Sequence, residues 1–313
     1  MQEVKVSAPG KIILFGEHAV VYNRPAIAVP VTQVQVEVTI TPLEKSSPNT
    51  VIIQSPNIGL ESELKDLLEH HPIKVALKGV CRKLNIAEIP PCSICIHSTI
   101  PVASGLGSGA AVSVALIRAV SAFCERPLSD AEVNELAYEV EKIHHLTPSG
   151  IDNSVITYEK PIFFIKGEPF STLEVGKPFW VIIGDTRISS PTAITVSEVR
   201  QAWEADRLTY ERIFDQIRDI VLQAKEAIET GEVERLGGLM NRNHELLRQI
   251  NVSSPELERI IAAALEAGAM GAKLSGSGRG GNMIALVHEH ESEPIAEAMQ
   301  KAGAMRTTLT RIG

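Results

Sequence analysis

Apolar and polar positions alternate along much of the first half of the chain. Residues 29–41 carry an apolar side chain at almost every second position, which predicts a long half-buried strand. Residues 73–84 repeat their apolar positions at helical spacing instead. Glu132 lies three residues after Ser129, as in a capping box that begins a helix. This half is predicted to contain strands at 4–7, 12–15, 29–41, 51–53 and 93–98, a turn at 45–49, and helices at 73–84, from 110 to 117 and from 130 to about 142.

The second half, from about residue 169, is richer in helical periodicity. Two long amphipathic helices are predicted, from 197 to about 230 and from 233 to about 250. Ser254 followed by Pro255 predicts the start of another helix, with serine as N-cap and proline in the first turn. Further strands are predicted at 179–184, 282–287 and 305–311, with a helix at 294–302 between the last two. The pattern predicts an α+β protein of two lobes, residues 1–168 and 169–313, that meet over a cleft.

Composition and charge exclude some classes of partner. The chain has 313 residues, of which 44% are hydrophobic and 22% charged, and its formal net charge is −8. An acidic chain of this kind argues against nucleic acid or an anionic membrane as its main partner. Neither an N-terminal signal peptide nor an apolar run of about 18 residues is seen, so a cytoplasmic protein without a membrane span is expected.

The four cysteines are better explained as reduced thiols than as metal ligands. Cys92 and Cys95 have the spacing of a metal-binding pair, and His97 lies close by. However, there is no second pair, and the strand-like alternation here would aim the two thiols at opposite faces. We therefore do not expect a zinc site.

Candidate chemistry is concentrated in a glycine-rich loop that runs into a helix of small residues. Gly105, Gly107 and Gly109 allow the backbone to turn tightly and to approach a ligand closely. The helix that follows presents the N–H groups of its first turn and the positive end of its dipole, which together favour phosphate. The loop matches neither a Walker A nor a Rossmann motif, and on its own it could equally be a turn before a core helix.

Two further motifs favour the phosphate-binding interpretation of this loop over a simple turn. Near the start stands Ala8-Pro9-Gly10-Lys11-Ile12-Ile13-Leu14-Phe15-Gly16-Glu17-His18-Ala19-Val20-Val21, and near the end Lys273-Leu274-Ser275-Gly276-Ser277-Gly278-Arg279-Gly280-Gly281-Asn282. In this order and spacing, the three motifs resemble the signatures of the GHMP kinases over nearly the whole chain. Within that family the form of the first motif is most similar to the mevalonate kinases, whereas galactokinases have an arginine-rich version.

The resemblance implies a two-lobe GHMP kinase fold with the active-site cleft between the lobes. It also implies transfer of the γ-phosphate of ATP to the 5-hydroxyl of mevalonate in isoprenoid biosynthesis, with Mg²⁺ as cofactor and a homodimer as the expected assembly. Phosphomevalonate kinase and mevalonate 3-kinase remain alternatives within the family. A catalytically silent GHMP-fold sensor is the alternative outside the enzymes.

Three charged residues are assigned roles by the resemblance. Asp152, in a Pro-Ser-Gly-Ile-Asp turn, would be the base that accepts or orients the hydroxyl proton, although such an aspartate alone is more often a cap. Lys11 would stabilise charge near the γ-phosphate, although a lone lysine is usually solvated. Glu141 would bind Mg²⁺ together with Ser108; Glu139 competes for this role but lies about 200° away on a helix.

Binding residues follow from the same resemblance. Glu17, His18 and Thr186 are expected to contact the acceptor. ATP is expected to be bound by Lys11, Ser98, Pro101, Val102, Ala103, Ser104, Gly105, Leu106, Gly107, Ser108, Gly109, Ala110 and Ala111.

The chain departs from the family pattern at three positions. Gly109 stands where a serine usually supplies a hydroxyl to magnesium, so water or Ser108 would have to complete the coordination. Arg279 occupies a glycine position of the third motif and either points towards an anion or faces solvent. Asn282 stands where cysteine is common.

Overall fold

The chain folds into two compact units, each built from segments that are distant in the sequence. The computed structural model describes residues 2–44, 47, 50–101, 104–144, 149–189 and 192–313. Unit 1 comprises residues 1–10, 34–102 and 106–159, and unit 2 comprises residues 11–33, 103–105 and 160–313. The first sequence motif, from Lys11 onward, therefore belongs to the same unit as the third. The division into domains 1–168 and 169–313 stays a prediction about the sequence.

Unit 1 is a twisted sheet with helices packed against it. Strand order is β4-β3-β5-β2, and β1 also pairs with β2. The β3–β5 pair is parallel, whereas β3–β4 and β2–β5 are antiparallel. The strands are β1 (Val4–Phe15), β2 (Ala26–Pro42), β3 (Val51–Ser55), β4 (Leu60–Glu63) and β5 (Cys92–Ser98), of which β1 and β2 are long enough to contribute residues to both units.

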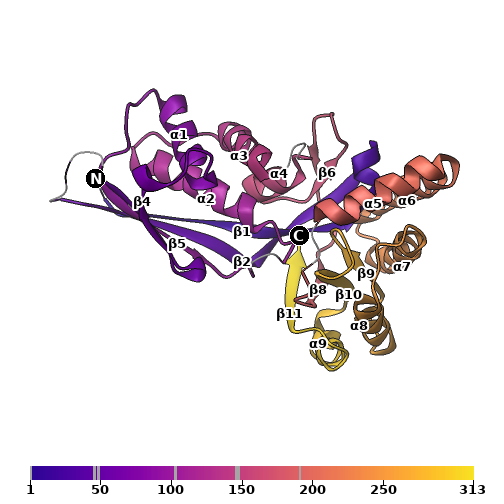
Figure 1. Ribbon diagram of the computed structural model, residues 1–313. Coiled ribbons are helices and arrows are strands. Elements are labelled where there is room, and N and C mark those ends of the chain that lie inside the picture. The colour runs from indigo at the N-terminus through magenta and orange to yellow at the C-terminus, as the bar shows by residue number, and fades with distance from the viewer. Residues whose placement is uncertain (1, 45–46, 48–49, 102–103, 145–148, 190–191) are drawn as a thin grey trace. The chain divides into compact units, whose positions relative to one another are not determined.

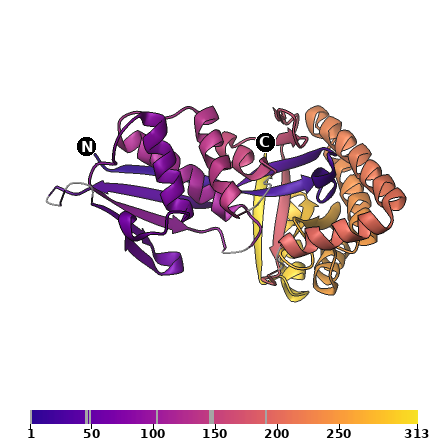
Figure 2. The same ribbon diagram turned by 45° about the horizontal axis from the view of Figure 1, so that its top comes forward.

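Four helices cover one face of that sheet, as Figure 1 and Figure 2 show. Helix α2 contacts each of the other three, and most of its residues are buried because its sequence is almost entirely Ala, Val, Leu, Ile and Ser. The helices are α1 (Pro72–Leu84), α2 (Ser108–Phe123), α3 (Asp130–His144) and α4 (Ile151–Tyr158), with short 3₁₀ turns η2 (Pro56–Ile58) and η3 (Leu64–Asp66).

Unit 2 is built on a four-stranded antiparallel sheet in the order β11-β8-β10-β9. Helices α7, α8 and α9 pack on this sheet, while α6 packs on α5 and α7. A short strand pair, β6 (Ile162–Phe164) and β7 (Ser171–Thr172), extends from the start of β2. The other elements are η1 (Ala19–Tyr22), β8 (Phe179–Asp185), α5 (Thr192–Ala205), α6 (Arg207–Thr230), α7 (Val233–Gln249), α8 (Pro255–Glu266), β9 (Gly271–Ser275), β10 (Asn282–Val287), η4 (Glu289–Glu291), α9 (Ser292–Lys301) and β11 (Arg306–Ile312).

The predicted helix starts are confirmed in atomic detail. Ser129 donates its hydroxyl and its backbone N–H to the Glu132 carboxylate, at 2.8 and 2.9 Å, and Glu132 N–H donates back to the Ser129 hydroxyl at 3.4 Å. These reciprocal bonds form a capping box. At the start of α8, the Ser254 hydroxyl accepts a bond from Leu257 N–H, and Pro255 occupies the first helical position.

The prediction of a single long helix from 197 to about 230 is wrong, because the helix is interrupted at Asp206, between α5 and α6. This residue leaves the helical conformation (φ −137°, ψ 69°) and its carboxylate accepts a bond from Thr209 N–H, which caps α6. Aspartate competes well for backbone donors, so it favours a helix start over a helix interior. The apolar period runs on through both helices and hides the break. The two runs predicted at 4–7 and 12–15 are likewise one strand, β1.

Part of the turn predicted at 45–49 lies outside the described residues. Within the described chain, no helix combines the length and the apolar character needed to cross a membrane.

Two neighbouring glycines of α7 provide a test of how closely this helix packs on β9. A Cβ at Gly237 would lie 2.4 Å from the Met270 carbonyl oxygen, whereas one at Gly238 would meet no atom within 4 Å. We expect Gly237→Ala to lower the free energy of unfolding by about 1–3 kcal/mol, because overpacking against backbone forces the helix away from the strand. Gly238→Ala should be neutral or raise it by up to about 1 kcal/mol through helix propensity. Urea unfolding of both variants measures the difference, and equal midpoints would contradict close packing of α7 at Gly237.

Candidate active site

The glycine-rich loop ends in the N-terminus of α2. Gly105 and Gly107 have φ of +75° and +76°, a left-handed conformation that glycine adopts without strain. Gly107 is the N-cap of α2 and offers no side chain to its first turn, so the helix start is left to bind another acceptor. Leu106 and Ala110 are buried and anchor the loop. Val102 and Ala103, two of the predicted ATP contacts, lie outside the described residues.

Gly109 lies in the first turn of α2 rather than in the loop. Its position is exposed, and a Cβ added there would meet no atom within 4 Å. The family's usual serine would therefore fit at this position without displacing anything. Ser108, the preceding residue, is half-buried at the start of the helix.

Ser98 ends β5, and Pro101 lies between this strand and the loop. The Ser98 hydroxyl donates to the Ile100 carbonyl and accepts from Ile100 N–H, both at 3.1 Å. Pro101 is half-buried. The hydroxyl of Ser98 thus shapes the turn that leads towards the glycine-rich loop.

Asp152 lies on the first turn of helix α4, not in the turn where the sequence places it. Gly150, at φ +86°, is the N-cap, and Asp152 is half-buried. The next residue fastens α4 to α3, because the Asn153 side-chain amide donates to Asn134 Oδ1 at 2.6 Å. Asp152 thus sits on a helix that is fixed to its neighbour, and its role as proton acceptor stays a prediction.

Two glutamates near the end of α3 differ in exposure as their spacing predicts. Glu139 is exposed and forms an ion pair with Lys142 at 2.6 Å. Glu141 lies on another face and is half-buried. Among the residues that the structure describes, no group of three or more His, Cys, Asp or Glu side chains could hold a metal ion. Magnesium usually binds through one or two carboxylates and the substrate's phosphates, so Glu141 and the Ser108 hydroxyl are a donor set that suits it.

In unit 2, the first and third motifs are joined by a fully buried ion pair. The side chains of Glu17 and Lys273 have no solvent exposure, and Lys273 Nζ bonds to Glu17 Oε1. Lys273 also donates to the Leu274 carbonyl at 2.7 Å. Burial raises the pKa of Glu17 and lowers the pKa of Lys273, and the attraction between them opposes both shifts. Glu17 is therefore committed to Lys273 within this unit, and its contact with the acceptor stays a prediction.

His18 follows in a strained backbone conformation, with φ +61°. Its Nε2 lies 3.0 Å from the Ser277 carbonyl, which can only accept, so Nε2 carries the proton. Burial lowers the pKa of His18 to about 4, and the positive charges of Arg279 and Lys273 contribute. The ring is thus neutral at physiological pH, with Nδ1 as its acceptor nitrogen. Lys11, the other charged residue predicted at the site from this unit, lies on β1 and is buried, with 6% of its surface exposed.

Thr186 and Arg279 both make contacts within unit 2. The Thr186 hydroxyl donates to the Gly281 carbonyl at 3.0 Å and accepts from Ile188 N–H at 3.2 Å. Arg279 forms an ion pair with Glu198 of α5 and donates to the Asn251 carbonyl at 3.1 Å. The sequence left open whether Arg279 points towards an anion or faces solvent. In the structure its guanidinium pairs with the Glu198 carboxylate of the same unit.

Sequence reasoning missed three residues of this region. Lys273, Glu198 and Asn282 were given no role, although Lys273 stands in an apolar strand where a lysine needs a buried partner. The Asn282 side-chain amide donates to the Ser104 carbonyl and so fixes the start of the glycine-rich loop to β10. The sequence offers no signal for Glu198, which is one of many acids on helix faces.

Comparison with known proteins agrees with the three motifs. Family models described as GHMP kinases N terminal domain and GHMP kinases C terminal match residues 71–160 and 224–304. The mevalonate kinase of Pyrococcus abyssi is 35% identical over 333 residues, covering 99% of this chain and 95% of that protein. The chain belongs to the GHMP kinase family.

Solved structures of this family match nearly the full chain. The L. major mevalonate kinase in complex with R-mevalonate has a TM-score of 0.84 at 31% identity, covering 98% of this chain and 95% of that one. The Methanococcus jannaschii mevalonate kinase has a TM-score of 0.87 at 29% identity, covering 100% and 99%. The predicted GHMP kinase fold is thereby confirmed.

The lowered pKa of His18 predicts an acid-dependent loss of stability. Between pH 6.5 and about 4 the unfolded chain binds a proton on this ring and the folded chain does not. Stability from His18 is therefore present above the unfolded pKa and is lost as pH falls towards 4, by at most about 1.4 kcal/mol per pH unit. His18→Asn, which tolerates positive φ, should lack this slope. Urea unfolding of parent and variant from pH 4 to 8 measures it; parallel curves below pH 6.5 would refute the shift.

Proposed function

We propose that this GHMP kinase transfers the γ-phosphate of ATP to the 5-hydroxyl of (R)-mevalonate, giving 5-phosphomevalonate and ADP. The observation that carries the proposal is the first motif, in which Glu17 and His18 are buried and bonded to the third motif at Lys273 and Ser277. Identity of 35% with a mevalonate kinase over almost the whole chain supports the same acceptor.

In the proposed reaction, the 5-hydroxyl oxygen forms a bond to the γ-phosphorus while the bond from that phosphorus to the β,γ-bridging oxygen breaks. Asp152 accepts or orients the hydroxyl proton. Lys11 stabilises negative charge on the transferred group, and the N-terminus of α2 binds phosphate oxygens through its N–H groups. His18 bonds to the acceptor through Nδ1.

Glu141 and Ser108 would hold Mg²⁺, which when bound neutralises charge on the phosphates. Gly109 leaves this chain without the hydroxyl that the family pattern supplies one position later. Water fills such positions readily, since magnesium retains several of its waters in proteins. We therefore assign Glu141 as the principal protein ligand.

The alternatives differ in acceptor or in turnover. A coupled ADP-release assay with mevalonate, phosphomevalonate, galactose and homoserine separates the enzymes from one another. Turnover with phosphomevalonate but not mevalonate would replace the proposed acceptor, and mass spectrometry of the product would distinguish 5- from 3-phosphorylation. ATP binding without turnover on any acceptor would favour the silent sensor.

The role of Asp152 predicts a selective loss of turnover. Asp152→Asn should bind ATP normally but reduce kcat by roughly 10²–10⁴, the effect of losing a positioned base. Asp130→Asn is a matched control, because Asp130 is also a first-turn aspartate of unit 1 but forms an exposed ion pair with Arg118. Steady-state kinetics with mevalonate measures both. Near-parental kcat in folded Asp152→Asn would refute the assignment.

The role of Glu141 predicts a change in magnesium dependence. Glu141→Gln should raise the magnesium concentration at half-maximal activity about tenfold or more, because it removes the carboxylate assigned to the ion. Glu139→Gln, on another face of α3, should leave that concentration within about twofold. Magnesium titration at saturating mevalonate and ATP compares the two variants. The reverse ranking would transfer the metal role to Glu139.

A further inference from the structure

The turn that follows His18 is fastened through its backbone to Gly16, Glu17 and His18. Val20 N–H donates to the Gly16 carbonyl at 3.1 Å, and Val21 N–H donates to the His18 carbonyl at 3.0 Å. Ala19 N–H bonds to the Glu17 carbonyl at 2.7 Å. A displacement of η1 would therefore move the backbone that carries Glu17 and His18.

Two positions of this segment have conformations that require support from their surroundings. His18 has a positive φ, which a residue with a Cβ adopts only at a cost. Gly16, at φ +97°, packs so closely that a Cβ would lie 2.5 Å from the Pro25 carbonyl oxygen. The backbone of residues 16–26 is thus a tightly closed loop, held in a form that its sequence alone does not favour.

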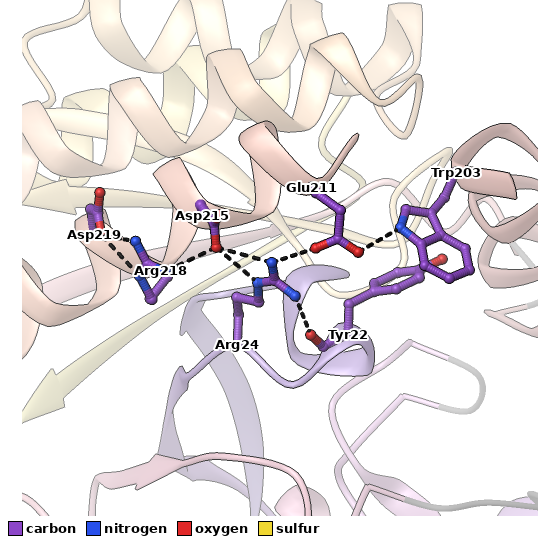
Figure 3. Close-up of polar contacts among 7 residues, drawn as sticks. All are labelled: Tyr22, Arg24, Trp203, Glu211, Asp215, Arg218 and Asp219. Carbon is purple, nitrogen blue, oxygen red and sulfur yellow. Dashed lines mark hydrogen bonds and ion pairs between the residues drawn. The ribbon is translucent and has the colours of Figure 1, made fainter. Parts of the chain in front are cut away.

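Arg24 holds the end of this loop against helix α6 (Figure 3). Its guanidinium donates to the Tyr22 carbonyl at 2.8 Å and to Asp215 Oδ1 at 3.0 and 3.2 Å, and it also bonds to Glu211. A planar guanidinium can serve three acceptors at once, which a lysine cannot do with the same geometry. Arg24 therefore joins the carbonyl of the last η1 residue to two carboxylates one helical turn apart.

Tyr22 adds an apolar contact beside the guanidinium. Its ring stacks on Phe214 of α6 at 4.3 Å between centroids and lies 5.2 Å from the ring of Trp203 on α5. The Trp203 ring N–H donates to Glu211 at 3.0 Å, so the Glu211 carboxylate accepts bonds from both Trp203 and Arg24. Burial raises the pKa of Tyr22 to about 12. The ring therefore stays neutral and packs as an aromatic side chain.

We propose that Arg24 and Tyr22 are positioning residues, which hold His18 in orientation for the acceptor by clamping η1 onto α6. The proposal rests on the proposed function, in which His18 contacts the acceptor. It assigns to this cluster a role in acceptor affinity rather than in ATP binding. Arg218 offers the matched control, because it also contacts Asp215, at 2.9 Å, but bonds to Asp219 instead of η1.

The first experiment tests the clamp without reference to any substrate. Hydrogen exchange of the amides of residues 16–24 is measured by mass spectrometry in the parent, Arg24→Gln and Arg218→Gln. Arg24→Gln should speed this exchange at least tenfold, and Arg218→Gln should change it less than twofold. Equal exchange in the parent and Arg24→Gln overturns the proposal, whatever the enzyme's acceptor is.

The second experiment tests the link to the acceptor by steady-state kinetics. Arg24→Gln and Tyr22→Ala should each raise KM for mevalonate at least tenfold and leave KM for ATP within twofold; Arg218→Gln should leave both within twofold. An equal rise in both KM values, or a fall in kcat alone, overturns the positioning role. If the parent itself does not phosphorylate mevalonate, the proposed function fails, while the exchange result still decides whether the clamp exists.

A conservative variant keeps the test decisive if Arg24→Gln does not fold. Arg24→Lys retains a positive charge near Glu211 and Asp215, which are themselves 33% and 43% exposed, but cannot reach every acceptor of the guanidinium. It should raise KM for mevalonate by an intermediate factor of about three to five. A parental KM in Arg24→Lys, together with parental exchange at residues 16–24, would show that charge alone accounts for the cluster and would overturn the clamp.

Discussion

The buried pair of Glu17 and Lys273 is the constraint on which the packing of the first motif against the third depends. Neither side chain reaches solvent, so each charge relies on the other, and removing one partner would leave an uncompensated charge in the interior. The pair links residues 256 positions apart in the sequence. It therefore fixes where the first motif lies on the third, and it leaves His18 beside Ser277 as a consequence.

One residue of the first motif and one of the third have strained backbones and are held by side-chain contacts. His18 and Arg279 both have positive φ although neither is glycine, and each makes a side-chain bond that stabilises the conformation. Arg279 is instructive because the family pattern has glycine there. Its ion pair with Glu198 and its bond to the Asn251 carbonyl act against the cost of the left-handed backbone, which is about 1–2 kcal/mol. The arginine that stands in place of glycine thus also supplies side-chain contacts that counter its backbone strain.

Most of the longer helices and strands were predicted from the sequence because their signals are local, whereas α4, β9 and the short strands β4, β6 and β7 were not predicted. Alternation identified β2, and caps identified the starts of α3 and α8, since these features depend on residues within a few positions of one another. The break at Asp206 was missed because the apolar period continues across it. The partners of Glu17, Arg24 and Arg279 could not be predicted, because they lie on helices and strands far away in the chain. The motifs identified the family, but only the fold shows which charged side chains are bonded to one another.

The arrangement of charge around Glu17 also bears on the role proposed for Lys11 beside the transferred phosphate, in a chain that is acidic overall. Burial raises the pKa of Glu17, while the positive charge of Lys273 and, more weakly, that of Lys11 act to lower it. One carboxylate thus faces two ammonium groups. If Glu17 and Lys273 are both ionised, the trio carries one excess positive charge. If the proton passes from Lys273 to Glu17, the excess is the same and resides on Lys11. The buried pair therefore leaves the positive charge of the first motif on Lys11, whichever of its members holds the proton, despite a net charge of −8 over the chain.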